Sequence, residues 1–359
     1  MSLLSDPGTR TKPTTPERPG ARQVGAREGA DLVENAPVLD PLKRWRPLPD
    51  KPDYAGVLTY AGQPLADDPA QLDGIDVAVL GAPTDDLVSD RPGTRYGPRA
   101  IRAASCPPGP HLEAGIDAFD VLRVVDYGDA AVIPADPDAT HAAIELLVGE
   151  VVDAGALPVT LGGDHSITEP CITAIATRRG PVGLVHFDTH TDTGREVFGV
   201  ERSHGTPMYR LVEERRVDPT RYAQIGLRGY WPGSDEFAWQ RERGIASFFM
   251  HDVRDLGIEE VVERALAHIG PGPTYVTVDI DVLDPAFAPG TGTPEPGGMT
   301  SIDLLRAVRR VATLVELVGA DVVEVLPSAI GSADITALAA ERVVRELLTG
   351  LALRRASGS

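Results

Sequence analysis

The chain has 359 residues, enough for two domains or for one large α/β domain. Its 34 basic and 53 acidic residues give a formal charge of −19, which repels phosphate backbones and anionic lipids, so nucleic-acid and membrane-surface binding are poor hypotheses. Only two cysteines occur, which excludes a disulfide-built scaffold. No signal-peptide pattern and no apolar run of about 18 residues is visible, so we expect a cytoplasmic protein.

The first fifty residues differ from the rest of the chain, because eight prolines stand among few large apolar side chains. Such a segment buries too little surface to offset its ordering entropy. We therefore expect a flexible tail over residues 1–35, an N-terminal arm over 36–73, one globular domain over 74–353 and a frayed end over 354–359.

From about residue 74 onward, short apolar runs alternate with segments of helical spacing. Strands are predicted over residues 77–80, 121–125, 157–161, 182–187, 222–227, 274–280 and 317–325. Helices are predicted over residues 98–105, 140–154, 261–269, 302–314 and 335–353, with another directly after His165. This alternation indicates a parallel sheet covered by helices on both faces, with functional residues at the carboxyl ends of its strands.

Four of the predicted strand ends carry side chains of the kind that bind metal ions. Each alone has an ordinary explanation, such as a helix cap, a solvated loop, an edge turn or a pair with an arginine. Together they crowd ionisable groups at apolar strand ends, where such groups repel one another unless a cation lies between them. The residues concerned are His165, then Asp188, His190 and Asp192, then Asp279 and Asp281, and finally Glu324.

The first six of these residues define a class of metal. Four carboxylates and two imidazoles, with no thiolate, suit Mn²⁺ best, with Ni²⁺, Co²⁺ or Fe²⁺ as alternatives. One ion does not need so many carboxylates, whereas two ions about 3.5–4 Å apart do. Such a pair lowers the pKa of a water held between the ions, so the residue types predict metal-assisted hydrolysis.

Longer segments around these residues resemble the signatures of the ureohydrolases, the family of arginase, agmatinase and the guanidino-acid hydrolases. The resemblance spans about residues 74–350 and implies a three-layer α/β/α domain with a mainly parallel eight-stranded sheet. It also implies two Mn²⁺ ions on the six residues above and a homo-oligomer, trimeric or hexameric. The matching segments are 162–165, 187–192 and 278–285, followed by 91–98, 203–207 and 288–298.

The same resemblance assigns roles to groups around the metal pair. It implies that Asp192 orients the attacking hydroxide and that His204 carries the proton to the departing amine. It further implies that Glu324 binds the guanidinium of the substrate through two parallel hydrogen bonds. The products are urea and an amine. Asp164 and Asp284 are expected to play supporting roles.

The part of the substrate beyond the guanidinium is less closely defined. Arginases carry an asparagine at the position of Gly194, so arginine is disfavoured. Agmatine, which yields putrescine and urea, is our first prediction because an acidic protein attracts its ammonium group. Arg195 or Arg202 pointing inward, or a pocket shaped by Tyr230 and Trp231, would favour a guanidino acid instead, such as 4-guanidinobutyrate or a proclavaminate-type substrate.

Three further alternatives have different chemistry. They are a guanidine hydrolase, a metal-binding relative without turnover, and a single-metal deacetylase of related architecture. The complete ligand set together with His204 and Glu324 disfavours the metal-binding relative without turnover. The pair Asp279 and Asp281 disfavours the deacetylase, which needs fewer carboxylates.

Overall fold

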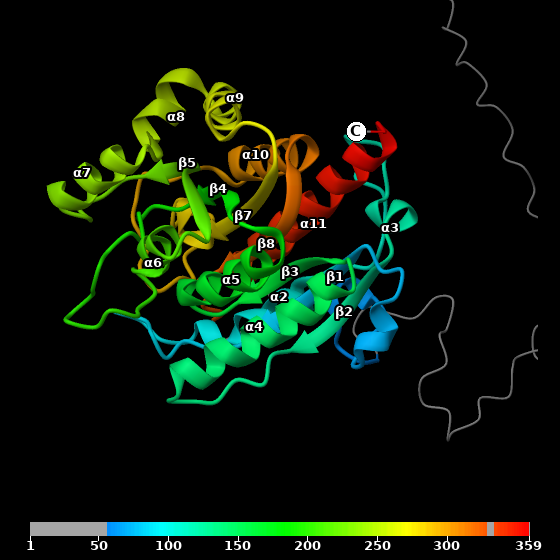
Figure 1. Ribbon diagram of the computed structural model, residues 1–359. Helices are drawn as coiled ribbons and strands as arrows, with labels where there is room; N and C mark the ends of the chain where they lie inside the picture. Colours follow the sequence, from blue (N-terminus) through cyan, green and yellow to red (C-terminus); the bar gives the residue numbers. More distant parts are fainter. Residues whose placement is uncertain (1–55, 329–333, 359) are drawn as a thin grey trace, which may run out of the picture. The chain divides into compact units, whose positions relative to one another are not determined.

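The computed structural model describes residues 56–328 and 334–358, so the expected tail and most of the expected arm lie outside the described residues. Within those residues, eight strands form one sheet in the order β2-β1-β3-β8-β7-β4-β5-β6. Every neighbouring pair is parallel. Helices cover both faces of this sheet (Figure 1), which confirms the expected three-layer α/β domain.

The strands are short and, apart from those near the sheet edges, almost wholly buried, as strands between two helical layers are. Seven of them correspond to predicted strands. The eighth, β6, was not predicted because its four residues form a half-buried edge strand with no long apolar run. The strands are β1 (Val77–Ala82), β2 (Val124–Asp129), β3 (Leu157–Gly162), β4 (Val182–Phe187), β5 (Val217–Leu227), β6 (Ala246–Phe249), β7 (Pro273–Asp279) and β8 (Glu316–Val323).

Capping residues account for helix boundaries that differ from the prediction. Helix α4 begins at Pro137 because the carboxylate of Asp136 accepts a hydrogen bond from the backbone nitrogen of Ala139. Val121, expected in a strand, ends the short helix α3. The α-helices are α2 (Gly97–Ala104), α3 (Ala118–Val121), α4 (Pro137–Asp153), α5 (Thr168–Arg179), α6 (Pro207–Glu213), α7 (Ser234–Arg243), α8 (Met250–Leu256), α9 (Ile258–Ile269), α10 (Ser301–Leu314) and α11 (Ile335–Ala356).

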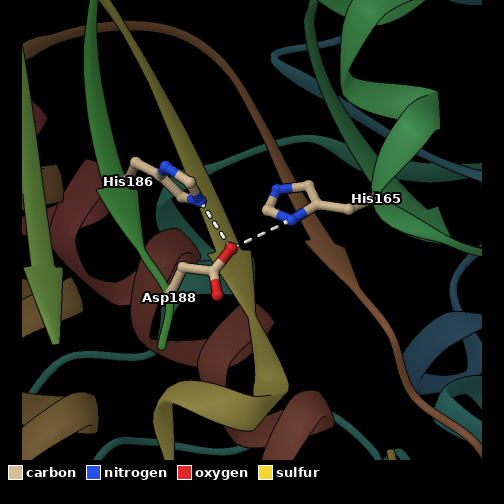
Figure 2. A group of neighbouring side chains, drawn as sticks. All are labelled: His165, His186 and Asp188. Atoms are coloured by element: carbon tan, nitrogen blue, oxygen red, sulfur yellow. Dashed lines mark hydrogen bonds and ion pairs between the residues drawn. The ribbon is translucent and has the colours of Figure 1, made fainter. Parts of the chain in front are cut away.

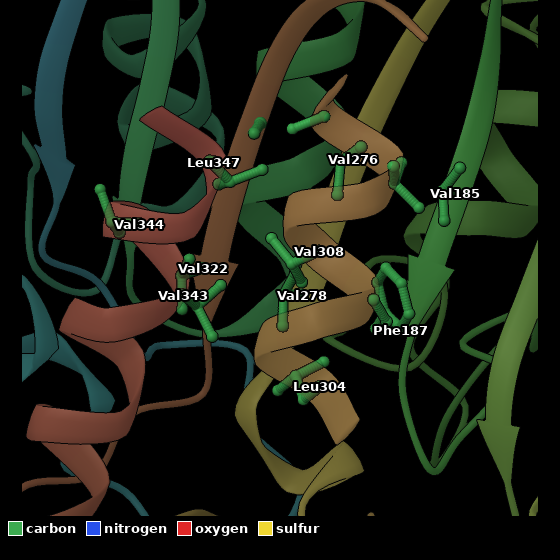
Figure 3. Close-up of a cluster of buried hydrophobic side chains, with 14 of the residues drawn as sticks. Val185, Phe187, Val276, Val278, Leu304, Val308, Val322, Val343, Val344 and Leu347 are labelled. Carbon is green, nitrogen blue, oxygen red and sulfur yellow. The ribbon is translucent and has the colours of Figure 1, made fainter. Parts of the chain in front are cut away.

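Each face of the sheet has its own hydrophobic core. Alternate side chains of a strand point to opposite faces, so Val79 of β1 packs into the core beneath α2, α9, α10 and α11, whereas Leu80 packs beneath α4, α5 and α6. Figure 3 shows the first core, in which Val308 of α10 and Leu347 of α11 cover valines of the central strands. Among the described residues, no helix combines the length and apolar character that a membrane span requires.

The described end of the expected arm, residues 56–73, packs against this domain. Tyr60 is fully buried there, and its backbone nitrogen donates to the carboxylate of Asp126 at 2.6 Å. That carboxylate also accepts hydrogen bonds from Arg102 of α2, so three segments meet at one buried ion pair.

The strand order brings the candidate site residues together at the carboxyl ends of the central strands. The strands β3, β8, β7 and β4 are neighbours at its centre, and all four run in the same direction. Their ends are level, since Phe187 pairs with Val278 and Asp279 pairs with Val323. Residues that follow these strands therefore meet, although they lie as far apart in sequence as His165 and Glu324.

Candidate metal centre

The first group of donors surrounds His165, which opens the short 3-10 helix η4 (His165–Ile167) after β3. Its Nδ1 lies 3.2 Å from an oxygen of Asp188, 2.8 Å from one of Asp192 and 3.3 Å from one of Asp279. His165, Asp188 and Asp279 are buried, whereas Asp192 is partly exposed. Three carboxylates thus converge on one imidazole nitrogen at the carboxyl edge of the sheet.

The second group lies beside the first and shares a residue with it. The Nδ1 atom of His190 is 3.1 Å from Asp281 Oδ2 and 3.6 Å from Asp188 Oδ1. The other oxygen of Asp188, Oδ2, faces His165. The two oxygens of Asp188 therefore face different donor groups, which is the geometry of a carboxylate between two cations. All six predicted metal ligands are brought together in this way.

The far side of the His165 ring fixes which nitrogen is free. Its Nε2 lies 2.9 Å from the hydroxyl of Thr277, and that hydroxyl donates to the buried carboxylate of Asp321. The hydroxyl proton is thereby committed, so Nε2–H must donate to Thr277. The Asp321 carboxylate is held in turn by the hydroxyls of Thr168 and Tyr275. In the neutral form that binds a cation, His165 consequently presents a lone pair at Nδ1 toward three carboxylates.

This arrangement fits cations and is repulsive without them. Nδ1 of His165 is buried and has no hydrogen-bond partner among the described residues. Burial alone lowers the pKa of His165, but the neighbouring carboxylates outweigh it and raise that pKa well above its ordinary value. Burial, with the charges of Asp281 and Asp188, raises the pKa of Asp279 well above its usual range. The cluster therefore requires added positive charge, and its oxygen and nitrogen donors suit a pair of divalent cations.

His186 is a site residue that the sequence analysis did not select. Its Nε2 lies 2.7 Å from Asp188 Oδ2, and its Nδ1 lies 2.9 Å from the hydroxyl of Tyr222. Figure 2 shows this ring approaching the same carboxylate oxygen as His165. Strand alternation was the available signal, because His186 stands two residues before Asp188 and so points to the same side.

Glu324 and His204 form a pair beside the predicted metal ligands. Glu324 is buried, and its Oε1 accepts hydrogen bonds from the backbone nitrogen of His165 and from His204 Nδ1, both at 2.9 Å. Its Oε2 has no partner among the described residues. A Cβ atom at Gly292 would stand 3.5 Å from Oε2, so the glycine keeps the space before this oxygen open. Glu324 thus offers one unused buried acceptor.

Two predicted site residues have unusual backbone conformations. Asp192 has φ +49° and Glu324 has φ +60°, both in the left-handed region that non-glycine residues avoid at a cost of about 1–3 kcal/mol. Gly163 also has positive φ, and a Cβ there would lie 2.4 Å from the carbonyl oxygen of Ala82. The turn that delivers His165 to the site therefore needs glycine, and the packing holds Asp192 and Glu324 in strained positions.

The two arginines considered for substrate recognition are engaged elsewhere. Arg202 forms ion pairs with Asp138 of α4 and Glu169 of α5, the latter at 3.1 Å. The exposed Arg195 donates to the hydroxyl of Tyr209 at 2.9 Å. Both guanidinium groups already have partners that are not candidate metal-site residues.

The two aromatic residues considered for the substrate pocket are largely exposed, and the arginine next to them supports a loop. Tyr230 and Trp231 are 92% and 76% exposed, and the neighbouring Arg228 donates to the backbone carbonyls of Asp281 and Glu295. Arg228 thereby ties the segment after β7 to the loop that contains Gly292. The sequence analysis did not identify this role.

Asp164 and Asp284 bind backbone nitrogens. Asp164 accepts a hydrogen bond from the nitrogen of Ser166 at 3.0 Å, and Asp284 accepts one from that of Gly297 at 2.7 Å. Burial, followed by the charge of Glu324, raises the pKa of Asp164 to about 6. These contacts fit the supporting roles expected of both residues.

Comparison with known proteins gives a consistent result. A protein-family model described as "Arginase family" matches residues 75–350 of this chain. Guanidinopropionase of Pseudomonas aeruginosa is 44% identical over 304 residues, which cover 84% of this chain and 93% of that protein.

Solved structures agree with the sequence matches. Proclavaminate amidinohydrolase from Streptomyces clavuligerus has a TM-score of 0.79 at 37% identity, covering 85% of this chain and 100% of the other. A hypothetical agmatinase from Burkholderia thailandensis has a TM-score of 0.77 at 39% identity, covering 86% and 94%.

Fold, site and similarity together define a hydrolase with a three-layer α/β/α domain that acts on guanidino or amidino groups. The chain belongs to the arginase family. Family membership confirms the resemblance predicted from the motifs and removes the deacetylase alternative.

Proposed function

We propose that this chain hydrolyses the guanidino group of a small linear compound to urea and an amine. One observation carries the proposal: Oε2 of Glu324 is a buried acceptor that has no partner within residues 56–328 and 334–358, and it lies beside a cluster that requires cations. A guanidinium presents N–H donors in a planar fork that suits a carboxylate. Its binding there would bring the guanidinium carbon close to the two donor groups.

We assign one cation to His165, Asp188, Asp192 and Asp279. The second cation belongs to Asp188, His190, Asp279 and Asp281, so Asp188 and Asp279 are shared. Mn²⁺ is the ion we propose for both positions, with Ni²⁺ or Co²⁺ as alternatives. When bound, such a pair supplies an activated water for attack on carbon.

The residues around the cations have distinct tasks in this proposal. Glu324 binds and orients the guanidinium, while Asp192 orients the water from its position beside His165. His204 holds a proton for the departing amine, since the charge of Glu324 outweighs the effect of burial and raises its pKa to about 9. A ring with that pKa carries a proton at neutral pH.

Agmatine is the first candidate substrate. Arg195 and Arg202 are both paired with other side chains, so the loop that contains them offers no free counter-charge for a carboxylate. The chain's charge of −19 favours a ligand with an ammonium tail. These observations support a cationic substrate over an anionic one.

A guanidino acid is the second candidate. The relative from P. aeruginosa is named guanidinopropionase, and a similar solved structure is proclavaminate amidinohydrolase. A Cβ at Gly292 would stand 3.4 Å from the carbonyl oxygen of Arg91, so this largely exposed arginine belongs to the wall beside Glu324. Its guanidinium forms a long, exposed ion pair with Asp90 at 3.9 Å, a partner that a substrate carboxylate could replace.

Urea release from the Mn²⁺-loaded protein tests the proposal. The panel is agmatine, 4-guanidinobutyrate, 3-guanidinopropionate, arginine and guanidine, with Glu324→Gln as the matched control. Agmatine turned over fastest supports the first candidate, and a guanidino acid turned over fastest supports the second. No urea from any compound, with two metals bound per chain, contradicts hydrolysis of these substrates.

The assembly state and location of the chain are also part of this proposal. We propose a homo-oligomer, trimeric or hexameric, on the strength of the family resemblance, and a cytoplasmic location because two cysteines suit a reducing compartment. Light scattering on the purified chain measures the assembly directly, and a monomer at working concentration would contradict it.

A further inference from the structure

A row of buried polar side chains crosses the sheet just before the strand ends that carry the candidate metal ligands. The strand register pairs each residue of the row with the next, so their side chains point to the same face. All are fully buried, in strands whose other residues are mostly apolar. From β5 through β4, β7 and β8 to β3, the row consists of Gln224, His186, Thr277, Asp321 and Thr160.

Asp321 is the acidic member of this row. Within residues 56–328 and 334–358, its carboxylate accepts hydrogen bonds from hydroxyl groups alone. Thr168 and Tyr275 donate to one oxygen, both at 2.8 Å, and Thr277 donates to the other. A buried carboxylate without an adjacent cation is costly, because the protein interior solvates its charge poorly. The counter-charge of Asp321 therefore has to come from beyond its direct neighbours.

Thr277 connects Asp321 to His165. The threonine hydroxyl donates its proton to the carboxylate, so its oxygen accepts from Nε2–H of His165, which lies 2.9 Å away. The hydroxyl has one proton, and turning it toward Nε2 would take it from the carboxylate. Asp321 thus holds the hydroxyl in the direction that keeps a ring proton at Nε2 and leaves Nδ1 for a cation. We call this chain of two hydrogen bonds the His165 relay.

We infer that Asp321, acting through Thr277, is a positioning residue for the cation at His165, an inference that rests on the proposed function. The carboxylate orients the ring and makes Nδ1 a stronger ligand. The cation in turn supplies the counter-charge that the buried carboxylate lacks. The second cation position is less dependent on Asp321, because Nδ1 of His190 faces other carboxylates and none of its described contacts reaches the relay.

Binding of Zn²⁺ to the full-length chain tests the relay at each cation position separately. Zn²⁺ is a d¹⁰ ion that accepts imidazole and carboxylate ligands. Nitrogen-15 NMR of histidine-labelled protein therefore shows when Nδ1 of His165 and Nδ1 of His190 are occupied. The variants His165→Asn and His190→Asn assign the two signals. A competing chelator sets the free Zn²⁺ concentration and gives an affinity for each position.

We expect Thr277→Val to weaken Zn²⁺ binding at His165 about tenfold to a hundredfold, with a smaller change at His190. Thr277→Ser keeps the hydroxyl and should restore most of the affinity. Asp321→Asn keeps the shape of the side chain but removes its charge, so it should also weaken binding at His165. Thr274→Val is the matched control and should change neither affinity, because this buried hydroxyl bonds to a backbone carbonyl at the opposite end of the same strand.

Three results would overturn the relay. They are wild-type affinity at His165 in Thr277→Val, wild-type affinity there in Asp321→Asn, and equal weakening at both histidines, which a general loss of packing would produce. A wild-type chain that binds Zn²⁺ at neither histidine would refute the metal centre and the relay with it. A wild-type chain that binds Zn²⁺ at both but releases no urea with Mn²⁺ would refute the proposed reaction, while selective weakening in the variants would still support the relay.

Discussion

Asp188 is the residue on which the two proposed cation positions depend. It is fully buried, and its two oxygens face His165 and His190 respectively. His186 adds a hydrogen bond to the oxygen that faces His165 and so fixes the carboxylate plane. Contacts with three imidazoles hold both oxygens of this buried carboxylate in place, as a ligand shared by two cations requires.

Asp188→Asn tests that sharing. The amide keeps the shape but removes the charge and one acceptor, so we expect bound metal to fall below two ions per chain and urea release to fall more than about a hundredfold. Metal analysis and turnover are measured on the same sample. Asp153→Asn, at an exposed aspartate of α4 paired with Arg178, is the control. Unchanged metal content and turnover in Asp188→Asn would refute the shared position.

The pair of His204 and Glu324 gives a prediction for pH. The charge of Glu324 outweighs burial and raises the pKa of His204 to about 9, so the ring keeps its proton below that pH and loses it as the pH rises through 9. We expect kcat to fall on the alkaline side near pH 9. In Glu324→Gln the raising charge is gone, so the residual activity should fall at a pH lower by about one unit or more. Identical alkaline limbs would contradict the assignment.

Single residues show how far sequence reasoning reaches into the site. The clustering of the six proposed ligands and Glu324 could be predicted, because each follows an apolar run and the carboxyl ends of these strands meet. His186 was missed although strand alternation places it on the same side as Asp188, because a histidine inside a buried apolar strand is as readily assigned to the core. The contact between the hydroxyl of Ser89 and Nε2 of His204 could not be predicted, because it joins residues 115 positions apart through a loop.

At the scale of elements, apolar periodicity predicted the central strands and failed where burial is partial. Helix α7 was missed because its ten residues are mainly charged or polar and only Gln240 is buried. The start of β5 at Val217 was missed because Asp218, Pro219 and Thr220 interrupt the apolar run. Elements at the edge of a sheet take their structure from neighbours, which a local pattern does not contain.

A buried ion-pair junction connects elements to the site. Glu169 of α5 binds Arg202, two residues before His204, and Arg210 of α6. We expect Glu169→Gln to lower the free energy of unfolding by about 1–3 kcal/mol, since the partly buried Arg202 and Arg210 then keep only counter-charges that are more exposed, on Asp138 and Glu214. Urea denaturation measures this cost. The control, Glu263→Gln, breaks an exposed pair with Arg310 and should cost less than about 1 kcal/mol. Equal costs would contradict a structural role for the junction.

At the scale of the whole molecule, strand order converts distant sequence into one site. The residues after β3, β4, β7 and β8 come together only because these strands are adjacent and parallel. The fold thereby gathers four aspartates at one edge of a chain that already carries 19 excess negative charges. Their mutual repulsion opposes folding until cations are present, so stability and metal binding are coupled.

Metal removal measures that coupling. Free metal at a hundred times its Kd adds about 2.7 kcal/mol per site to the folded state, which raises Tm by about 5 °C for a chain of this size. We expect chelation to lower Tm by at least that much and Mn²⁺ to restore it. Acid should have the same effect, because protonated carboxylates and imidazoles release their cations as pH falls. Asp188→Asn should respond less to chelation than wild type. A wild-type chain with the same Tm before and after chelation would refute a cation site built into the fold, since buried carboxylates cannot lose their counter-charge without cost.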